Sequence, residues 1–277
     1  MKNIVILTGS EPRHTFLRKA IALSGGCTVA RTYCEGLEQS LDARLARSGG
    51  ADADLQRAHV DARARSEADF FALFNRFAED RSHPAFIEKG AINEASHTED
   101  VIGLDPDLLV AYGCSLIKEP LISRFPGRFL NVHLGLSPYY RGSGTNFFPL
   151  VDGAPEYVGA TFMHLDAGID TGEIIHQIRA RVFPGDTPHQ IGNRLIGDVA
   201  VVYGELIRRF DELEPVSPPP EPETARLCKR KDFTEAATEK LYEQFGGGMI
   251  ERYLAEVDAR YARVPIAVNP GLADIAP

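Results

Sequence analysis

Two polar residues at the end of a short apolar run are the first candidates for chemistry in this chain. Asn131 and His133 close a run that starts at Phe129, and a loop with glycine and proline follows. Side chains alternate along a strand, so both would project from the same face near its carboxyl end. Ligands of open α/β sheets bind at those ends, where an amide can donate a hydrogen bond and an imidazole can move a proton. For His133 alone, a polar strand end before a turn would be the favoured interpretation.

A second segment, 158–175, places two acidic residues in a polar loop between two apolar runs. The loop carries Asp166, Gly168, Asp170 and Gly172, and a hairpin with a long tip explains its glycines. Asp is a common turn residue, so an Asx-turn cap is the alternative role for Asp170. A glycosidase is a remote hypothesis, because two carboxylates so close in one loop are poorly placed to flank a glycosidic bond.

Together the two segments resemble the formyltransferases that use 10-formyltetrahydrofolate, a family that includes methionyl-tRNA, glycinamide ribonucleotide and sugar-nucleotide formyltransferases. The family pattern is Asn-x-His, a proline five residues after the histidine, often an Arg-Gly pair, and then an Asp within Gly-x-Asp-x-Gly. The matching residues here are Asn131, His133, Pro138, Arg141, Gly142, Gly168, Asp170 and Gly172. The resemblance is good from about Leu104 to Ile196, faint before that and weak after Phe210.

The resemblance implies catalytic roles for Asn131, His133 and Asp170. Moving a formyl group from folate to an amine passes through a tetrahedral oxyanion, which needs hydrogen-bond donors and a proton path. Asn131 would donate to the oxyanion, and His133 would donate when protonated or accept the amine's proton when neutral. A nearby Asp170 would raise the pKa of His133 and orient its ring. No metal or covalent intermediate is required.

The resemblance also implies where the two substrates bind, with the pterin of 10-formyltetrahydrofolate held largely by backbone groups. The residues expected around the folate are Tyr112, Ile117, Leu165, Asp166 and Gly168. The residues expected at the acceptor are Gly9, Arg13, Tyr139, Tyr140 and Arg141. Plainer roles stay open: Asp166 as a loop stabiliser, the two tyrosines as loop packing, and the segment around Gly9 as an ordinary turn.

Composition limits the classes of partner. The net charge is −9 and the pI is near 5.4, which argues against general nucleic-acid binding. No apolar run approaches the ~20 residues of a transmembrane helix. The first residues do not read as a signal peptide, so we expect no membrane partner and a cytoplasmic location. The four cysteines lack CxxC spacing, which predicts neither a zinc site nor a disulfide framework.

Apolar periodicity predicts an α/β fold. Strands are expected near 3–7, 27–33, 108–111 and 130–133, and helices near 12–23, 66–83 and 188–210. This alternation predicts a Rossmann-like, mainly parallel sheet flanked by helices, with a short helical C-terminal extension. The predicted divisions are a catalytic domain over 1–214, a proline-rich linker over 215–223 and the extension over 224–277. Residues 35–65 fit either a helix or a mobile loop.

A small amine is the favoured acceptor, and by analogy within the family an aminosugar on a nucleotide is the first choice. The chain is acidic and only about 55 residues follow the linker, which both argue against a methionyl-tRNA formyltransferase. A diphosphate could contact Arg13, Arg141 or the basic patch (Lys229, Arg230 and Lys231), although a solvated surface is the plainer role of that patch. The alternatives are a hydrolase that releases formate from the same folate, and a folate-binding module without turnover. A homodimer is compatible with the sequence.

Overall fold

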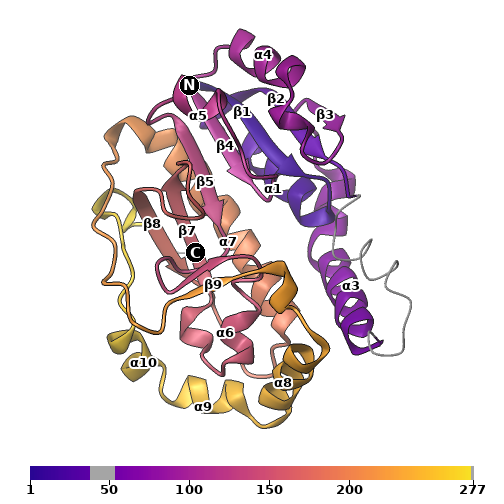
Figure 1. Cartoon of the computed structure of the whole chain (residues 1–277), viewed down its shortest axis with the longest axis vertical. Coiled ribbons are helices and arrows are strands. Elements are labelled where there is room, and N and C mark those ends of the chain that lie inside the picture. Colours follow the sequence, from indigo (N-terminus) through magenta and orange to yellow (C-terminus); the bar gives the residue numbers. More distant parts are fainter. Residues whose placement is uncertain (38–53, 276–277) are drawn as a thin grey trace.

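A seven-stranded sheet forms the centre of the protein (Figure 1), whose computed structural model describes residues 1–37 and 54–275. The strands are β1 (Lys2–Gly9), β2 (Cys27–Glu35), β3 (Pro84–Ile87), β4 (Leu108–Tyr112), β5 (Phe129–His133), β7 (Gly159–His164) and β8 (Ile174–Arg179). Their order is β3-β2-β1-β4-β5-β7-β8. The first five pair in parallel, whereas β7 is antiparallel to both of its neighbours. The predicted mainly parallel α/β fold is confirmed.

Helices cover both faces of this sheet. They are α1 (Pro12–Leu23), α3 (Asp54–Phe77), α4 (Ala95–Gly103), α5 (Leu121–Arg124), α6 (Phe148–Val151), α7 (Pro188–Arg209), α8 (Glu235–Gly246), α9 (Met249–Ala255) and α10 (Val257–Arg263). The helices α1, α3 and α7 contact one another, and Figure 1 shows α8, α9 and α10 following one another past α6. Within the described ranges, no helix combines the length and apolar character that crossing a bilayer requires.

The helix α7 shows how local sequence signals fix an element that the sheet then buries. Thr187 accepts a hydrogen bond from the backbone of Gln190 at 3.3 Å, and Pro188 occupies the first helical position. Ile191 and Leu195 follow at helical spacing and are fully buried in the main hydrophobic cluster. Burying each such side chain stabilises the fold by roughly 1.5–3 kcal/mol, so the helix is fixed by packing as well as by its cap.

The region between β2 and β4 differs from the prediction. The helix α3 begins at Asp54 and ends at Phe77, whereas we expected it to start at Ser66 and to end just before Pro84. The residues from Pro84 to Ile87 instead form the edge strand β3, which is one of the few strand positions where proline is tolerated. The predicted ambiguous segment 35–65 is helical from Asp54 onward, and 38–53 lies outside the described residues.

A second, two-stranded sheet joins distant parts of the chain. The strand β6 (Tyr140–Gly142) pairs in parallel with β9 (Arg226–Cys228), which follows the proline-rich segment. Further on, Ala267 lies beside β8 and accepts a hydrogen bond from the backbone of Gln177 at 2.8 Å. Parts of the predicted C-terminal extension therefore pack directly on the sheet and its loops, and the domain division itself stays a prediction.

Candidate active site

The strand β5 carries Asn131 and His133 to its carboxyl end on one face of the sheet. The intervening Val132 points to the other face, where it joins the main hydrophobic cluster. His133 is 7% exposed. The side-chain amide of Asn131 has no hydrogen-bond partner among the described residues, and it is only partly buried. The strand thus presents a shielded imidazole beside an amide that is available to a ligand.

The loop between β7 and β8 brings Asp170 to this imidazole. Its carboxylate Oδ2 lies 3.3 Å from Nδ1 of His133 and accepts a hydrogen bond from the backbone N–H of Gly142 at 2.8 Å. Asp170 has a φ of +53°, a left-handed conformation that Asp tolerates better than most residues. The two segments singled out in the sequence therefore converge on one pair.

The charge state of His133 follows from burial and two acceptors. Its Nε2 lies 3.2 Å from the carbonyl oxygen of Tyr140, on the opposite side of the ring from Asp170. Burial lowers the pKa of His133 below its ordinary value, and the Asp170 charge and the Tyr140 carbonyl offset only part of that shift. The predicted effect of Asp170, which raises this pKa, is present, but the larger effect of burial was not anticipated and leaves the pKa lowered. A mainly neutral His133 is suited to accept a proton near pH 7.

Two buried side chains hold the loop that follows His133. Thr161 lies opposite His133 in the antiparallel pair, and Gln177 lies opposite Thr161 on the next strand. The hydroxyl of Thr161 donates to Gly135 O at 2.6 Å and accepts from Ser137 N at 3.0 Å. The amide of Gln177 donates to Ser137 O at 2.6 Å and to Thr161 at 2.9 Å. A buried loop needs such partners for its backbone groups, so this row of side chains fixes its course.

The strand β9 supports the same loop from its outer side. Cys228 lies opposite Gly142, and its carbonyl accepts a hydrogen bond from Ser143 N at 2.9 Å. Gly142 has a φ of +91°, and a Cβ there would lie 2.2 Å from the Cys228 carbonyl oxygen. The close approach therefore requires glycine at 142, the residue whose N–H holds Asp170.

The residues predicted around the folate lie in two adjacent segments. Ile117 is buried in a hydrophobic cluster against which Leu165 packs. Asp166 accepts hydrogen bonds from Gly168 N at 3.0 Å and from the Thr171 hydroxyl at 2.9 Å, so it stabilises the hairpin loop. Leu165 donates a backbone hydrogen bond to Phe129 O at 2.7 Å at the start of β5, and the contact of these segments with a ligand remains a prediction. The remaining candidate, Tyr112, is buried in the other cluster at the end of β4.

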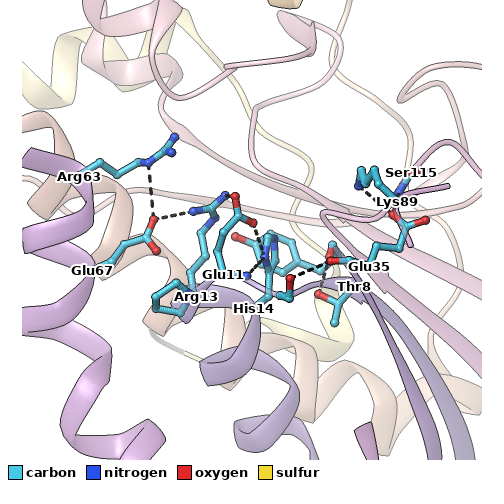
Figure 2. A network of polar contacts seen from close by, with 12 residues as sticks. Thr8, Glu11, Arg13, His14, Glu35, Arg63, Glu67, Lys89 and Ser115 are labelled. Atoms are coloured by element: carbon cyan, nitrogen blue, oxygen red, sulfur yellow. Dashed lines mark hydrogen bonds and ion pairs between the residues drawn. The ribbon is translucent and has the colours of Figure 1, made fainter. Parts of the chain in front are cut away.

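The turn after β1 is occupied by the protein's own charges (Figure 2). Arg13 pairs with Glu11 at 3.0 Å and with Glu67 of α3 at 2.6 Å, and His14 Nδ1 lies 2.7 Å from Glu11. Burial alone would raise the pKa of Glu11, but the His14 contact and the Arg13 charge lower it well below its usual range. The ring of His14 also fills the space where a Cβ on Gly9 would lie. An anionic ligand at Arg13 would have to replace these carboxylates.

The remaining acceptor candidates are partnered inside the protein. The hydroxyl of Tyr139 donates to Pro265 O at 2.7 Å, and that of Tyr140 donates to Asp152 at 2.9 Å. Both rings are buried, as the loop-packing interpretation describes. Arg141 pairs with Glu221 at 3.1 Å. A role for these three residues in acceptor binding remains a prediction.

Sequence reasoning missed the residues that support the site. Thr161 and Gln177 look like ordinary strand residues, and only the strand register shows that they lie in line with His133. Their alternation with apolar neighbours was the one available signal. Across the described ranges, no cluster of three or more His, Cys, Asp or Glu side chains could hold a metal ion.

Comparison with known proteins shows which family this chain is related to. A sequence profile described as formyl transferase matches residues 55–202, which is more than half of the chain. The chain belongs to the formyl transferase family. Within this family, the methionyl-tRNA formyltransferase of Thermus thermophilus is 32% identical over 177 residues, covering 60% of this chain and 55% of that protein. The homologue of the same name from Desulforamulus reducens is 33% identical and covers 44% and 38%, respectively.

The chain thus spans about half the length or less of these curated relatives. Among solved structures, a sugar N-formyltransferase from Shewanella has a TM-score of 0.55 at 16% identity, covering 84% of this chain and 78% of that one. A phosphoribosylglycinamide formyltransferase from Streptococcus pneumoniae has a TM-score of 0.51 at 21% identity, covering 76% and 99%. At such identities the structural likeness shows the fold alone.

Proposed function

We propose that the protein is an N-formyltransferase that moves a formyl group from 10-formyltetrahydrofolate to a small amine. The observation that carries this proposal is the convergence of Asn131, His133 and Asp170, contributed by two separate segments, at the carboxyl end of the sheet. The donor set fits the cosubstrate, since one amide lacks a partner among the described residues and one shielded imidazole has a pKa below its ordinary value.

Each of the three residues has a distinct task in this reaction. A bond forms between the acceptor nitrogen and the formyl carbon, and the bond from that carbon to the folate nitrogen breaks. The Asn131 amide donates to the formyl oxygen as negative charge develops there. Neutral His133 accepts the proton that the attacking amine loses, and the adjacent Asp170 carboxylate stabilises the resulting imidazolium. The same proton then passes to the leaving folate nitrogen.

We further propose that the acceptor carries a phosphate or diphosphate, with an aminosugar nucleotide as the first choice. The basic patch supports this assignment. Arg230 and Lys231 are exposed and have no ion-pair partner within residues 1–37 and 54–275. They directly follow β9, whose Cys228 pairs with Gly142 beside the catalytic Asp170. Arg13 and Arg141 are weaker candidates because each already pairs with a carboxylate.

The acceptor proposal is tested with a panel of amines and 10-formyltetrahydrofolate. Formylated product is measured for aminosugar nucleotides, for the same aminosugars without the nucleotide, and for glycinamide ribonucleotide. Arg230→Ala together with Lys231→Ala should raise KM for the nucleotide-linked sugar about tenfold and leave KM for the free sugar unchanged. Equal KM values in the variant and the wild type would exclude the patch from acceptor binding.

The same assays distinguish three other functions. The curated relatives named methionyl-tRNA formyltransferase favour methionyl-tRNA as an alternative acceptor, which is added as a separate arm. A hydrolase would use the same three residues with water as the nucleophile. Formate release that does not depend on any amine would identify that activity, whereas saturable folate binding without product would indicate a non-catalytic module.

A further inference from the structure

The loop that follows β4, residues 113–118, is held in place by side chains from outside it. The Thr8 hydroxyl of β1 donates to Tyr112 O at 2.7 Å, where the loop leaves the strand. Figure 2 shows Thr8 with Glu35, Lys89 and Ser115 at this end of the sheet. The loop itself has no regular secondary structure, so these contacts replace the backbone hydrogen bonds that a helix or strand would provide.

Glu35, the last residue of β2, is the main anchor. It is 1% exposed, and its carboxylate accepts hydrogen bonds from Ser115 N at 2.6 Å, Gly90 N at 3.0 Å and Lys89 Nζ at 2.8 Å. A buried carboxylate persists only when its oxygens are matched in this way. Among the described residues its contacts include neither His133 nor Asp170, so we assign its role to the loop.

Asn93 holds the next part of the loop with both ends of its amide. Its Nδ2 donates to Leu116 O at 3.0 Å, and its Oδ1 accepts from Lys118 N at 2.8 Å. Three consecutive anchor points therefore fix the backbone at Ser115, Leu116 and Lys118. Between them, the N–H of Leu116 and both backbone groups of Ile117 have no hydrogen-bond partner in the described part of the chain.

The unpaired backbone groups lie beside the segment proposed to receive the folate. Ile117 packs in the hydrophobic cluster that Leu165 of the hairpin loop also contacts. A flat heteroaromatic ring with alternating donors and acceptors, such as a pterin, is the class of ligand that a fixed stretch of peptide groups can bind. Its affinity depends on those groups being held in one geometry before binding.

We propose that Glu35 and Asn93 are positioning residues that set the affinity for 10-formyltetrahydrofolate by fixing the backbone of residues 115–118. This inference rests on the proposed function and adds to it two residues that lie outside the predicted folate site. Ser115 N donates to Oε2 of Glu35 and Gly90 N to Oε1, so Glu35→Gln, which turns one oxygen into an NH₂ donor, leaves one of these two N–H groups without its acceptor. Asn93→Asp keeps the acceptor for Lys118 N but removes the donor to Leu116 O.

The test measures binding of tetrahydrofolate by calorimetry, together with kcat and the KM values for both substrates. We expect each variant to raise both the Kd for tetrahydrofolate and the KM for the formyl donor about tenfold. The kcat at saturation and the KM for the acceptor should change less than twofold. Hydrogen–deuterium exchange at the amides of 115–118 should become faster in both variants.

The matched control is Asp198→Asn on α7. Asp198 is 4% exposed and pairs with Arg181 at 2.5 Å, so this variant also neutralises a buried, paired carboxylate. It should lose stability as Glu35→Gln does but bind tetrahydrofolate like the wild type. If Glu35→Gln does not fold, the partly exposed Asn93 carries the test.

The outcomes separate this inference from the proposed function. Suppose that the wild type binds tetrahydrofolate and that both variants keep the same Kd and the same hydrogen–deuterium exchange at 115–118. This result would overturn the positioning role and leave the formyltransferase proposal intact. An equal rise in the Kd for tetrahydrofolate in Asp198→Asn would also overturn the positioning role, because the weaker binding would then follow from general destabilisation. Wild-type protein that does not bind tetrahydrofolate would overturn both proposals together.

Discussion

The two sides of the proposed site differ in whether their charged and polar groups are paired within the protein. At the turn after β1, Arg13 is matched by Glu11 and Glu67, and Figure 2 shows these side chains turned toward one another. At the end of β5, the Asn131 amide lacks a partner among the described residues, and the nearby basic patch lacks an ion pair there. Asn131 is partly buried and the basic patch is exposed, so these groups can pair with a ligand without first losing a partner among the described residues. We therefore propose that the first side serves stability and the second serves binding and catalysis.

We expect the largest effect, a loss of activity, from substitutions of His133 and Asp170. His133→Ala removes the proton acceptor and should lower kcat by about 10²–10⁴-fold. Asp170→Asn should lower kcat by about 10²-fold while keeping the left-handed backbone, since Asn tolerates that conformation. Formation of formylated product and unfolding in urea are measured in parallel. Normal rates in either variant would remove the catalytic assignment.

A large loss of stability is expected from Gly142→Ala. The new Cβ would overlap the Cys228 carbonyl and require a left-handed alanine, so unfolding free energy should fall by about 3 kcal/mol or more. Gly25→Ala is the control, because Gly25 has a φ of +76° but no atom within 4 Å of an added Cβ. It should cost only about 1 kcal/mol. Equal losses by urea denaturation would show that the β6–β9 contact does not constrain residue 142.

Glu67→Gln tests whether the ion pairs at the turn after β1 serve stability. This variant removes one of the two charged partners of Arg13, and the free energy of unfolding should fall by about 2 kcal/mol. Because Glu67 lies on α3 and has no contact with His133, kcat should stay within twofold of the wild type. A large fall in kcat with unchanged stability would reverse the roles assigned to the two sides.

A smaller effect is expected from Thr161→Val, which removes the hydroxyl that holds Gly135 and Ser137. We expect kcat to fall about tenfold and stability to fall by about 1–2 kcal/mol. Thr32→Val removes an equally buried hydroxyl that donates to Ser82 O at 2.6 Å, and it should cost similar stability without changing kcat. Thr161→Ser should restore most of the activity. Equal kcat in the two valine variants would reduce Thr161 to a structural role.

The smallest effect concerns pH dependence. The pKa of His133 lies below its ordinary value of 6.5, so kcat/KM should be level above pH 6.5 and fall as His133 becomes protonated at lower pH. The Asp170 charge raises this pKa, although burial outweighs it. In Asp170→Asn the acidic limb should therefore move to lower pH. A limb that moves to higher pH would contradict the sign of this interaction.

Much of the fold and the approach of Asp170 to His133 could be predicted because their signals are local. The period of two through Asn131 and His133 and the glycine-shaped loop around Asp170 each lie within one segment. The residues that support the site could not be predicted, because their contacts join distant parts of the chain. Cys228 reaches Gly142 from far along the chain through a three-residue strand, too short to show a pattern. The partnership of Arg13 with Glu67 and the burial that lowers the His133 pKa likewise depend on tertiary packing.

The contact between Gln177 and Ala267 has a consequence for biosynthesis. The Gln177 side chain, which holds the loop after His133, accepts a hydrogen bond from the backbone N–H of Ala267 at 2.9 Å. A ribosome delivers the parallel strands long before residue 267, so a nascent chain can assemble its sheet while this support is still missing. Translation that stops after α7 would therefore leave a polypeptide with its main sheet, Asn131, His133 and Asp170, but without the last restraints on their geometry.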